Sequence, residues 1–397
     1  MSQFTLIAIL GIASVFALAA EGYEYEHWNN RPREEFSQGA QMFQKAKDIL
    51  KKEYYKDGIT DDELYRAAVA GMVEHLDPKM KEWNHLLSPT ELSEMKTDVS
   101  GEIVGSGLEI SLHDSLVDIL ATIPASPAEK AGIRAGDKLL AINGALCNGK
   151  QLRDIVYQIR GKVGETRKLT LLRDDKVLTK TLRLDVIPYA NVTSETLPGN
   201  VGLIGIRYFS ETTSRSLKSA LEKARDRRVG GLIIDLRGNG GGLFNSAVES
   251  AGYLLRKGKT IVSVSKRGIA DEKILAQGEQ LIKGIPLIVL VNEATHCGAE
   301  VVAAALRESA GAKLVGNRTH GKWSVQKIEE LGNSFALHFT TGLLTSPSGQ
   351  SFNGTGVEPD IAVSMEANDK IPRPTNTEER LGADIQLRTA LNLLRAS

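Results

Sequence analysis

The sequence predicts a multidomain α/β (α+β) protein, because three stretches differ in their periodicity. Apolar residues recur at helical spacing in residues 38–95, which predicts a helical N-terminal region. Residues 101–187 combine glycine turns with short apolar strands, which predicts a small β domain. From residue 201 onward, strands alternate with amphipathic helices, as in a layered α/β core.

Individual elements follow from the same patterns. In the β domain we expect a helix over residues 152–159 and strands over residues 117–123, 138–143 and 168–172. In the core we expect strands over residues 202–207, 231–236 and 285–291, the second being a continuous apolar run typical of a strand covered on both faces. Core helices are expected over residues 213–225, 245–255 and 298–306, with a closing helix over residues 381–394.

The N-terminal region divides into a leader and helices. Asp61 and Asp62 stand where a helix N-cap belongs, and Pro78 ends the second helix because proline disfavours helix at the preceding residue. Residues 4–20 are apolar but shorter than the about 20 residues that span a bilayer. A small–x–small run at residues 17–19 has the form of a signal-peptidase site, although a positive n-region is missing. We expect a signal peptide or membrane anchor and an extracytoplasmic body.

Composition excludes several classes of function. The 397 residues carry 49 basic and 49 acidic side chains, so no global field favours nucleic acid or an anionic surface. No basic run with interleaved aromatic residues is present, which excludes the usual nucleic-acid-binding pattern. Cysteine occurs only at Cys147 and Cys297, too few for a disulfide framework or a zinc cluster. His, Asp and Glu show no metal-ligand spacing, so no metal or other cofactor is expected.

A peptide-binding motif lies in the β domain. Residues 126–137 begin Ser-Pro-Ala, contain an Ala-Gly pair and end Gly-Asp, and they are similar to the signature of PDZ domains in bacterial proteases. In such a domain a glycine-rich loop aims backbone N–H groups at a terminal carboxylate, and a strand edge accepts the peptide by β-addition. The candidate peptide-binding residues are Gly105, Gly107, Leu108 and Ile110. The alternative is a small β domain that binds nothing.

Two core segments carry the catalytic candidates. Residues 292–300 close an apolar strand and open an apolar helix, where enzymes expose nucleophiles, and Cys297 lies there with Gly298 behind it. Residues 316–326 hold Lys322 in a glycine-containing loop, and Gln326 follows four positions on.

Together these segments resemble the catalytic core of the carboxyl-terminal processing peptidases, with Cys297 where that family has its nucleophilic serine. The resemblance implies a core of the ClpP/crotonase-like type, Lys322 as the general base and Gln326 as the residue that orients it. Residues 235–242 are similar to a stretch of the family that contributes a backbone N–H to the oxyanion hole. The implied oxyanion-hole residues are Gly241, Gly242 and Gly298.

A cysteine changes the proton chemistry of this pair. Ordinary pKa values are about 8.5 for a thiol and about 10.4 for a lysine amine, so the proton favours the amine. We therefore expect a thiolate–ammonium pair, and the helix that begins after Cys297 is expected to lower the thiol pKa further. Lys322 would then stabilise charge and protonate the leaving amine. Trp323, where the family has glycine, is expected to narrow the site.

Neighbouring residues leave further alternatives. His296 and His320 flank the pair in sequence, and an imidazole can activate a thiol. His320 is the better candidate, because the side chain of His296 is expected to diverge from that of Cys297; otherwise both are polar rim residues. Glu300 is expected to cap the helix. Arg160 resembles an arginine that couples the PDZ domain to the core in relatives.

The expected domains are a leader (residues 1–20), a helical region (38–99), a PDZ domain (100–187), a peptidase core (188–364) and a C-terminal tail and helix (365–397). The expected function is an exported endopeptidase that recognises proteins or peptides with free C-termini. Two alternatives remain open: a pseudo-peptidase that binds without cutting, or a cysteine introduced to trap substrate. A homo-oligomer is compatible with the sequence, and membrane association would run only through the N-terminal segment.

Overall fold

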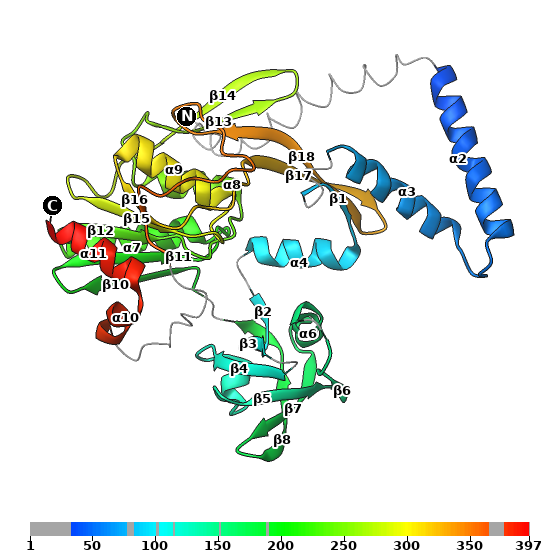
Figure 1. Ribbon diagram of the computed structural model, residues 1–397, viewed down its shortest axis with the longest axis horizontal. Helices are drawn as coiled ribbons and strands as arrows, with labels where there is room; N and C mark the ends of the chain where they lie inside the picture. Colours follow the sequence, from blue (N-terminus) through cyan, green and yellow to red (C-terminus); the bar gives the residue numbers. More distant parts are fainter. Residues whose placement is uncertain are drawn as a thin grey trace, which may run out of the picture. The chain divides into compact units, whose positions relative to one another are not determined.

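The computed structural model in Figure 1 describes residues 33–77, 83–100, 103–113, 116–150, 152–187, 190–364 and 377–396. It contains two compact units, Met1–Pro78 and Lys79–Ser397, which are treated separately below. The predicted leader over residues 1–20 lies outside the described residues. Within the described ranges, no helix combines the length and the apolar character that crossing a membrane requires.

The first unit is helical, as predicted. Its elements are α2 (Arg33–Glu53) and α3 (Asp61–His75). The N-cap of α3 is Thr60, whose hydroxyl accepts the N–H of Glu63 at 3.2 Å while the Glu63 carboxylate accepts the N–H of Thr60 at 2.8 Å. The prediction that Asp61 and Asp62 cap this helix was wrong by one residue, because the reciprocal hydrogen bonds with Glu63 select the threonine.

The first described strand of the second unit lies where the sequence predicted helix. β1 (His85–Leu87) pairs antiparallel with β18 (Phe335–Thr345), with His85 opposite His338. The N–H of Thr340 donates to the side chain of Asn84 at 2.8 Å, which fixes the approach to β1. Helix α4 (Pro89–Ser100) follows. The helical region predicted over residues 38–99 is thus interrupted, because pairing with β18 overrides local helical spacing.

Residues 103–187 form a β domain closed by its own ends. The entering strand β2 (Ile103–Gly105) pairs antiparallel with the leaving strand β9 (Asp185–Ile187). Between them, a sheet runs in the order β3-β4-β5-β7-β8, with β6 beside β5. Its elements are β3 (Leu108–His113), β4 (Leu116–Thr122), α5 (Pro127–Lys130), β5 (Lys138–Ile142), β6 (Ala145–Leu146), α6 (Leu152–Ile159), β7 (Thr166–Arg173) and β8 (Lys176–Arg183).

The predicted PDZ signature packs against the glycine turn of this domain. Ser126 caps α5, and a Cβ added to Gly107 would lie 2.2 Å from the Ser126 Cβ, so only glycine fits there. At the far end of the signature, Asp137 is 1% exposed and forms two hydrogen bonds with Arg173, at 2.6 and 2.7 Å. The Arg173 guanidinium holds the pKa of Asp137 below its usual range, outweighing its desolvation.

The core is built on a six-stranded sheet ordered β10-β11-β12-β15-β16-β19. β10 and β11 are antiparallel, and the remaining neighbours are parallel. The strands are β10 (Val192–Leu197), β11 (Val201–Ile206), β12 (Gly231–Asp235), β15 (Leu287–Val291), β16 (Lys313–Gly316) and β19 (Ile361–Ala362). The predicted α/β core is confirmed.

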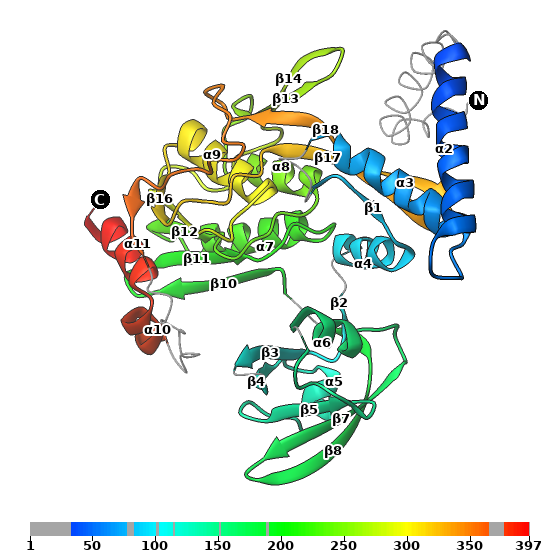
Figure 2. The ribbon, with the colours of Figure 1, turned by 45° about the vertical axis from the view of Figure 1, so that its right-hand side comes forward.

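Helices cover both faces of this sheet (Figures 1 and 2). They are α7 (Thr213–Asp226), α8 (Phe244–Gly252), α9 (Gly298–Ala310), α10 (Thr377–Ala383) and α11 (Ile385–Ala396). Alternate residues of β12 divide between two apolar clusters: Leu232 and Ile234 pack with α7–α9, while Ile233 packs with Leu391 of α11. Burial on both faces explains the continuous apolar runs in these strands.

A second sheet, which the sequence did not reveal, lies beside the core helices. It contains β1, β13 (Thr260–Lys266), β14 (Ile269–Leu275), β17 (Ser324–Gly332) and β18. Trp323 precedes β17, is fully buried and stacks near Phe352, with ring centroids 5.0 Å apart. The expectation that Trp323 narrows the site was therefore wrong, because its ring belongs to the apolar core.

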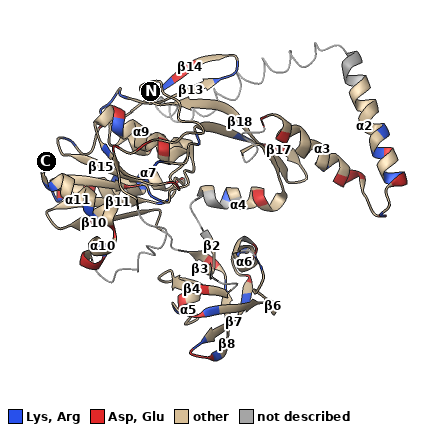
Figure 3. Cartoon of the chain, viewed as in Figure 1, with Lys and Arg blue, Asp and Glu red and all other residues tan. Residues whose placement is uncertain are grey.

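Basic and acidic side chains are interspersed along the described elements (Figure 3). This distribution agrees with the balanced sequence charge.

Replacing Asp137 by Ala should unfold the β domain more readily. The change leaves Arg173 without its buried partner, which costs about 3 kcal/mol. Because the pKa of Asp137 is lowered in the folded state, its contribution is present above the usual aspartate range and is lost as pH falls through the lower folded-state value. Urea unfolding at neutral and acidic pH measures this, and equal destabilisation at every pH would contradict it.

Candidate active site

Two loops leave neighbouring strands at the same edge of the core sheet. β12 and β15 are parallel neighbours with Asp235 opposite Leu290, so the segments after them emerge side by side, where open α/β sheets bind ligands. The N–H of His296 donates to the carbonyl of Asn239 at 3.0 Å and joins the two loops. Asn239 is fully buried, and its amide donates to the carbonyl of Ile206 at 2.9 Å.

Cys297 has a strained backbone at the start of α9. Its φ is 56° and its ψ is −122°, a conformation that non-glycine residues rarely adopt and that clusters at functional sites. A sharp, strained turn from strand to helix exposes the nucleophile in α/β-hydrolases. Residues 235–242, called the glycine loop below, pass close to Cys297. A Cβ on Gly241 would lie 2.8 Å from the Cβ of Cys297, so this approach requires glycine at position 241.

A single carboxylate joins the two predicted catalytic segments. Glu300 is fully buried, and its oxygens accept the N–H of Cys297 at 3.0 Å and the N–H groups of Gly321 and Lys322 at 2.8 Å each. The hydroxyl of Thr319 also donates to it. The predicted helix cap is present. Glu300 also fixes the backbone of the cysteine loop (residues 292–300) to that of the lysine loop (residues 316–326).

The structure thus brings Cys297 and Lys322 into one site. Burial raises the pKa of the Cys297 thiol, opposed by the charge of Lys322 and by the N–H of Gly298. Burial lowers the pKa of Lys322, opposed by the charges of Cys297 and Glu300. The expectation that the helix start leaves the thiol pKa lowered was wrong, because desolvation outweighs it. The two shifts bring the pKa of the thiol and the pKa of the amine closer together. They therefore reduce the preference for a thiolate–ammonium pair.

The three glycines predicted for the oxyanion hole lie around Cys297 but are not equivalent. The N–H of Gly241 donates to the side chain of Asn239 at 2.8 Å and is therefore occupied. The N–H of Gly298 faces the sulfur. The N–H of Gly242 finds no acceptor among the described residues, and its φ of 126° brings a built Cβ within 2.3 Å of the Phe209 carbonyl oxygen. The role of these glycines in an oxyanion hole stays a prediction.

Gln326 lies in β17, close to the lysine loop in sequence. Its amide donates to Ser324 at 2.7 Å and to Thr340 at 3.4 Å, and Thr340 is also the residue that binds Asn84. Among the described residues no hydrogen bond joins Gln326 to Lys322. Its predicted role in orienting the lysine stays a prediction.

The further candidates from the sequence, His296, His320 and Arg160, lie in different places. The rings of His296 and His320 are 4.9 Å apart, and the side chain of His296 bonds to the backbone of Gly240 in the glycine loop. Burial lowers the pKa of His296, and the charges of His320 and Lys322 lower it further. Arg160 is exposed just after α6, and its carbonyl accepts the guanidinium of Arg167.

The PDZ candidates occupy an edge strand. Leu108 and Ile110 belong to β3, which stands first in its sheet, and both pack partly against the apolar core of the domain. Gly107 has a φ of 76°, and its carbonyl accepts the N–H of Ile123 at 2.8 Å. Gly105 pairs with β9. An edge strand after a glycine turn is the arrangement that β-addition of a peptide requires.

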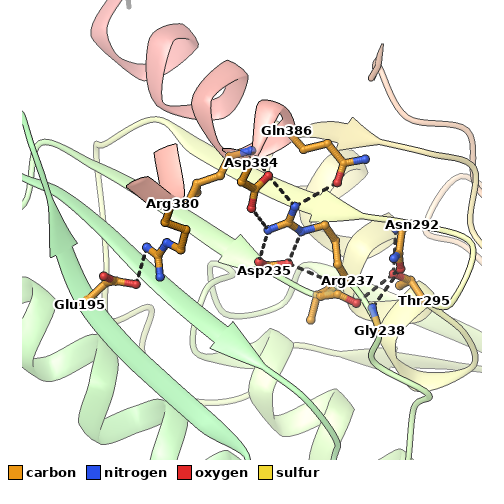
Figure 4. A network of polar contacts seen from close by, with 11 residues as sticks. Glu195, Asp235, Arg237, Gly238, Asn292, Thr295, Arg380, Asp384 and Gln386 are labelled. Carbon is orange, nitrogen blue, oxygen red and sulfur yellow. Dashed lines mark hydrogen bonds and ion pairs between the residues drawn. The ribbon is translucent and has the colours of Figure 1, made fainter. Parts of the chain in front are cut away.

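A partly buried ion network supports the glycine loop from the C-terminal side (Figure 4). The guanidinium of Arg237 donates to Asp235 at 2.9 and 2.7 Å and to Asp384 at 2.8 and 2.7 Å. It also reaches Gln386 of α11 at 3.0 Å. Burial acts to lower the pKa of Arg237, but the two carboxylates outweigh it and raise that pKa.

The network continues into the cysteine loop (Figure 4). The N–H of Gly238 donates to the side chain of Asn292 at 2.9 Å. The hydroxyl of Thr295 donates to the carbonyl of Leu236 at 2.8 Å and to Asn292 at 3.3 Å. The C-terminal helix, the glycine loop and the cysteine loop therefore share one set of polar contacts.

Comparisons with known proteins agree with this geometry. The profile of peptidase family S41 matches residues 200–363, and a PDZ domain profile matches residues 119–173. The carboxy-terminal processing protease CtpA of Bacillus subtilis (strain 168) is 32% identical over 329 residues, covering 83% of this chain and 70% of that protein.

The chain belongs to peptidase family S41.

Two further S41 relatives extend the match. A protein of Staphylococcus saprophyticus described as a probable CtpA-like serine protease is 32% identical over 400 residues, covering 98% of this chain and 79% of the relative. A solved structure of a photosystem II D1 C-terminal processing protease has 27% identity and a TM-score of 0.53, covering 85% of this chain and 89% of the other. The predicted family, fold class and function as a PDZ-containing C-terminal processing protease are confirmed.

Sequence reasoning missed three residues of this S41 site. Glu300 was assigned only a cap, although its place three residues after the N-cap also marks a capping box. Asp384 and Trp83 lie far from the motifs in sequence, and no local pattern marks either. Trp83 covers the amine of Lys322, with Nζ 3.5 Å from its ring centroid. In the part of the chain that the structure describes, no three His, Cys, Asp or Glu side chains are placed to hold a metal ion.

Replacing Glu300 by Gln should lower kcat about 100-fold with little change in KM. The amide nitrogen of glutamine is a donor, so it cannot accept the N–H groups that one carboxylate oxygen of Glu300 accepts. The hydrogen bonds at that oxygen are lost, each worth about 1.5–3 kcal/mol. Glu293→Gln is the matched control, because Glu293 is exposed in the same loop and accepts the side-chain amide of Asn317 at 3.1 Å. Equal kcat for both variants would contradict the role of Glu300.

Replacing Asp384 by Asn should weaken both stability and turnover. Asp384 is buried, and the change removes its charge from the guanidinium of Arg237, so we expect a loss of about 3 kcal/mol in the free energy of unfolding. Glu195→Gln is the control, because it weakens the more exposed pair with Arg380 (2.6 Å) in the same region. Urea unfolding and peptidase assays measure both. Wild-type values for Asp384→Asn would show that α11 does not support the glycine loop.

Proposed function

We propose that this S41 protease cuts peptide bonds with Cys297 as nucleophile and Lys322 as its proton partner. One observation carries the proposal: the Glu300 carboxylate binds the backbone N–H of both residues, which holds them in one site. The strained backbone of Cys297 supports it further. Gly242 and Gly298 supply backbone N–H groups to the oxyanion, each worth about 3 kcal/mol in the transition state.

The proposed reaction runs in two steps. The thiolate of Cys297 attacks the peptide carbonyl carbon, the C–N bond breaks, and the Lys322 ammonium gives its proton to the leaving amine. A thioester on Cys297 and a neutral Lys322 remain. Water then attacks the thioester and passes a proton to Lys322, which releases the new carboxyl end and restores the thiolate–ammonium pair.

Substrate selection is assigned to the PDZ domain, proposed to span residues 100–187 ahead of a peptidase core over residues 188–364. The edge strand β3 adds the substrate C-terminus as a further strand, with Leu108 and Ile110 contacting its apolar side chains. The turn at Gly107 faces the terminal carboxylate. Residues 1–20 are proposed to direct the body to an extracytoplasmic location.

One experiment tests the proposal. An unfolded substrate with an apolar C-terminus is incubated with wild type, Cys297→Ala, Cys297→Ser and Lys322→Ala, alongside the same substrate with an amidated C-terminus. Wild type should cleave, the two alanine variants should lose at least about 1000-fold in kcat/KM, and the amidated substrate should be cut more slowly.

The other outcomes are equally informative. Full cleavage by Cys297→Ala would exclude the cysteine as nucleophile. Cleavage by Cys297→Ser but not by wild type would identify a disabled or substrate-trapping enzyme. Binding of the C-terminus without cleavage by any form would favour the alternative function, a PDZ-based binding protein.

A further inference from the structure

An aromatic ring lies over the proposed proton partner. The Nζ of Lys322 is 3.5 Å from the ring centroid of Trp83, well within the about 6 Å over which a cation is attracted to an indole face. His320 stands edge-on to the same ring at 6.3 Å between centroids, with the ring planes at 90°. The proposed mechanism gives Trp83 no task.

The position of Trp83 is set by its neighbours. The adjacent Asn84 is 3% exposed and accepts the N–H of Thr340 at 2.8 Å. The next residue, His85, opens β1 and pairs with His338 of β18. The ring therefore lies two residues before a paired strand of the sheet that also contains Gln326.

Burial and nearby charges act in opposite directions on the pKa of Lys322, and burial prevails, so that pKa is lowered. Burial favours the neutral amine, while Cys297 and Glu300 favour the ammonium. On the histidine side, His296 and His338 are both influenced by the charge of Lys322, and burial keeps both of them towards the neutral form. The face of an indole attracts the ammonium but not the neutral amine, so Trp83 favours the ammonium form of Lys322.

We propose that Trp83 is a positioning residue that holds Lys322 as an ammonium and so suits this active site to a cysteine nucleophile. The inference rests on the proposed function. A serine needs a neutral lysine to accept its proton during attack, whereas a cysteine can transfer its proton from Sγ to Nζ beforehand, with no change in net charge. The ring stabilises the product of that transfer.

The first arm of the test measures the thiolate directly. Full-length wild type, Trp83→Phe and Trp83→Leu are treated with iodoacetamide across pH, and alkylation of the Cys297 peptide is followed by mass spectrometry. At about pH 7, Trp83→Leu should react about fivefold more slowly than wild type, and Trp83→Phe should stay within about twofold because it keeps an aromatic face. The buried Cys147 is the internal reference for intact folding.

The second arm uses a serine nucleophile, for which removing the ring should raise activity instead of lowering it. In a Cys297→Ser background, Trp83→Leu should raise cleavage of an unfolded substrate about threefold, since losing the ring frees the neutral amine that serine needs. A merely structural role for Trp83 would lower activity in both backgrounds. Unchanged alkylation in folded Trp83→Leu, or loss of activity in both backgrounds, would overturn the inference.

The two proposals fail in different ways. If neither the cysteine nor the serine form cleaves, the proposed function is wrong, and the alkylation arm still decides whether Trp83 acts on the pair. If wild type cleaves through Cys297 but its alkylation profile ignores Trp83, the proposed function stands and the role of Trp83 is rejected.

Discussion

The site depends on one buried carboxylate. Glu300 accepts hydrogen bonds from the backbones of two segments that are separate in sequence, one carrying Cys297 and the other Lys322. A carboxylate buried this deeply is costly unless its oxygens are satisfied, and here four donors satisfy them. The same burial that makes the clamp strong removes water from the pair, and so opposes the charges that the chemistry needs.

Other interactions therefore have to offset the cost of burying charge on the Cys297 sulfur and the Lys322 nitrogen. Charge attraction between Cys297 and Lys322 restores part of what desolvation removes, and the N–H of Gly298 adds to it on the sulfur side. The ring of Trp83 supplies a further contribution on the nitrogen side without introducing another charge. Support from outside the site comes through Arg237, whose ion pair with Asp384 and hydrogen bond to Gln386 of α11 connect the C-terminal segment to the glycine loop (Figure 4).

Local patterns in the sequence predicted most of the fold and part of the site. The run of residues 231–235 reads as a strand covered on both faces, and the structure confirms it. Position-specific motifs predicted which segments meet, because spacing along a strand–loop–helix unit is local information. The contacts of Trp83 and Asp384 could not be predicted, since both depend on strand pairing or helix docking between residues distant in sequence. The direction of the pKa shift of Cys297 was mispredicted, because burial cannot be seen in a sequence.

The central claim is that the sulfur of Cys297 and the amine of Lys322 face each other within reach of a single small molecule. Ortho-phthalaldehyde tests this directly, because it forms a fluorescent isoindole only where a thiol and an amine lie side by side. The account predicts one isoindole that joins the Cys297 and Lys322 peptides, and its loss in Glu300→Gln. Separate adducts on other lysines, with no product linking these two residues in the folded wild type, would contradict it.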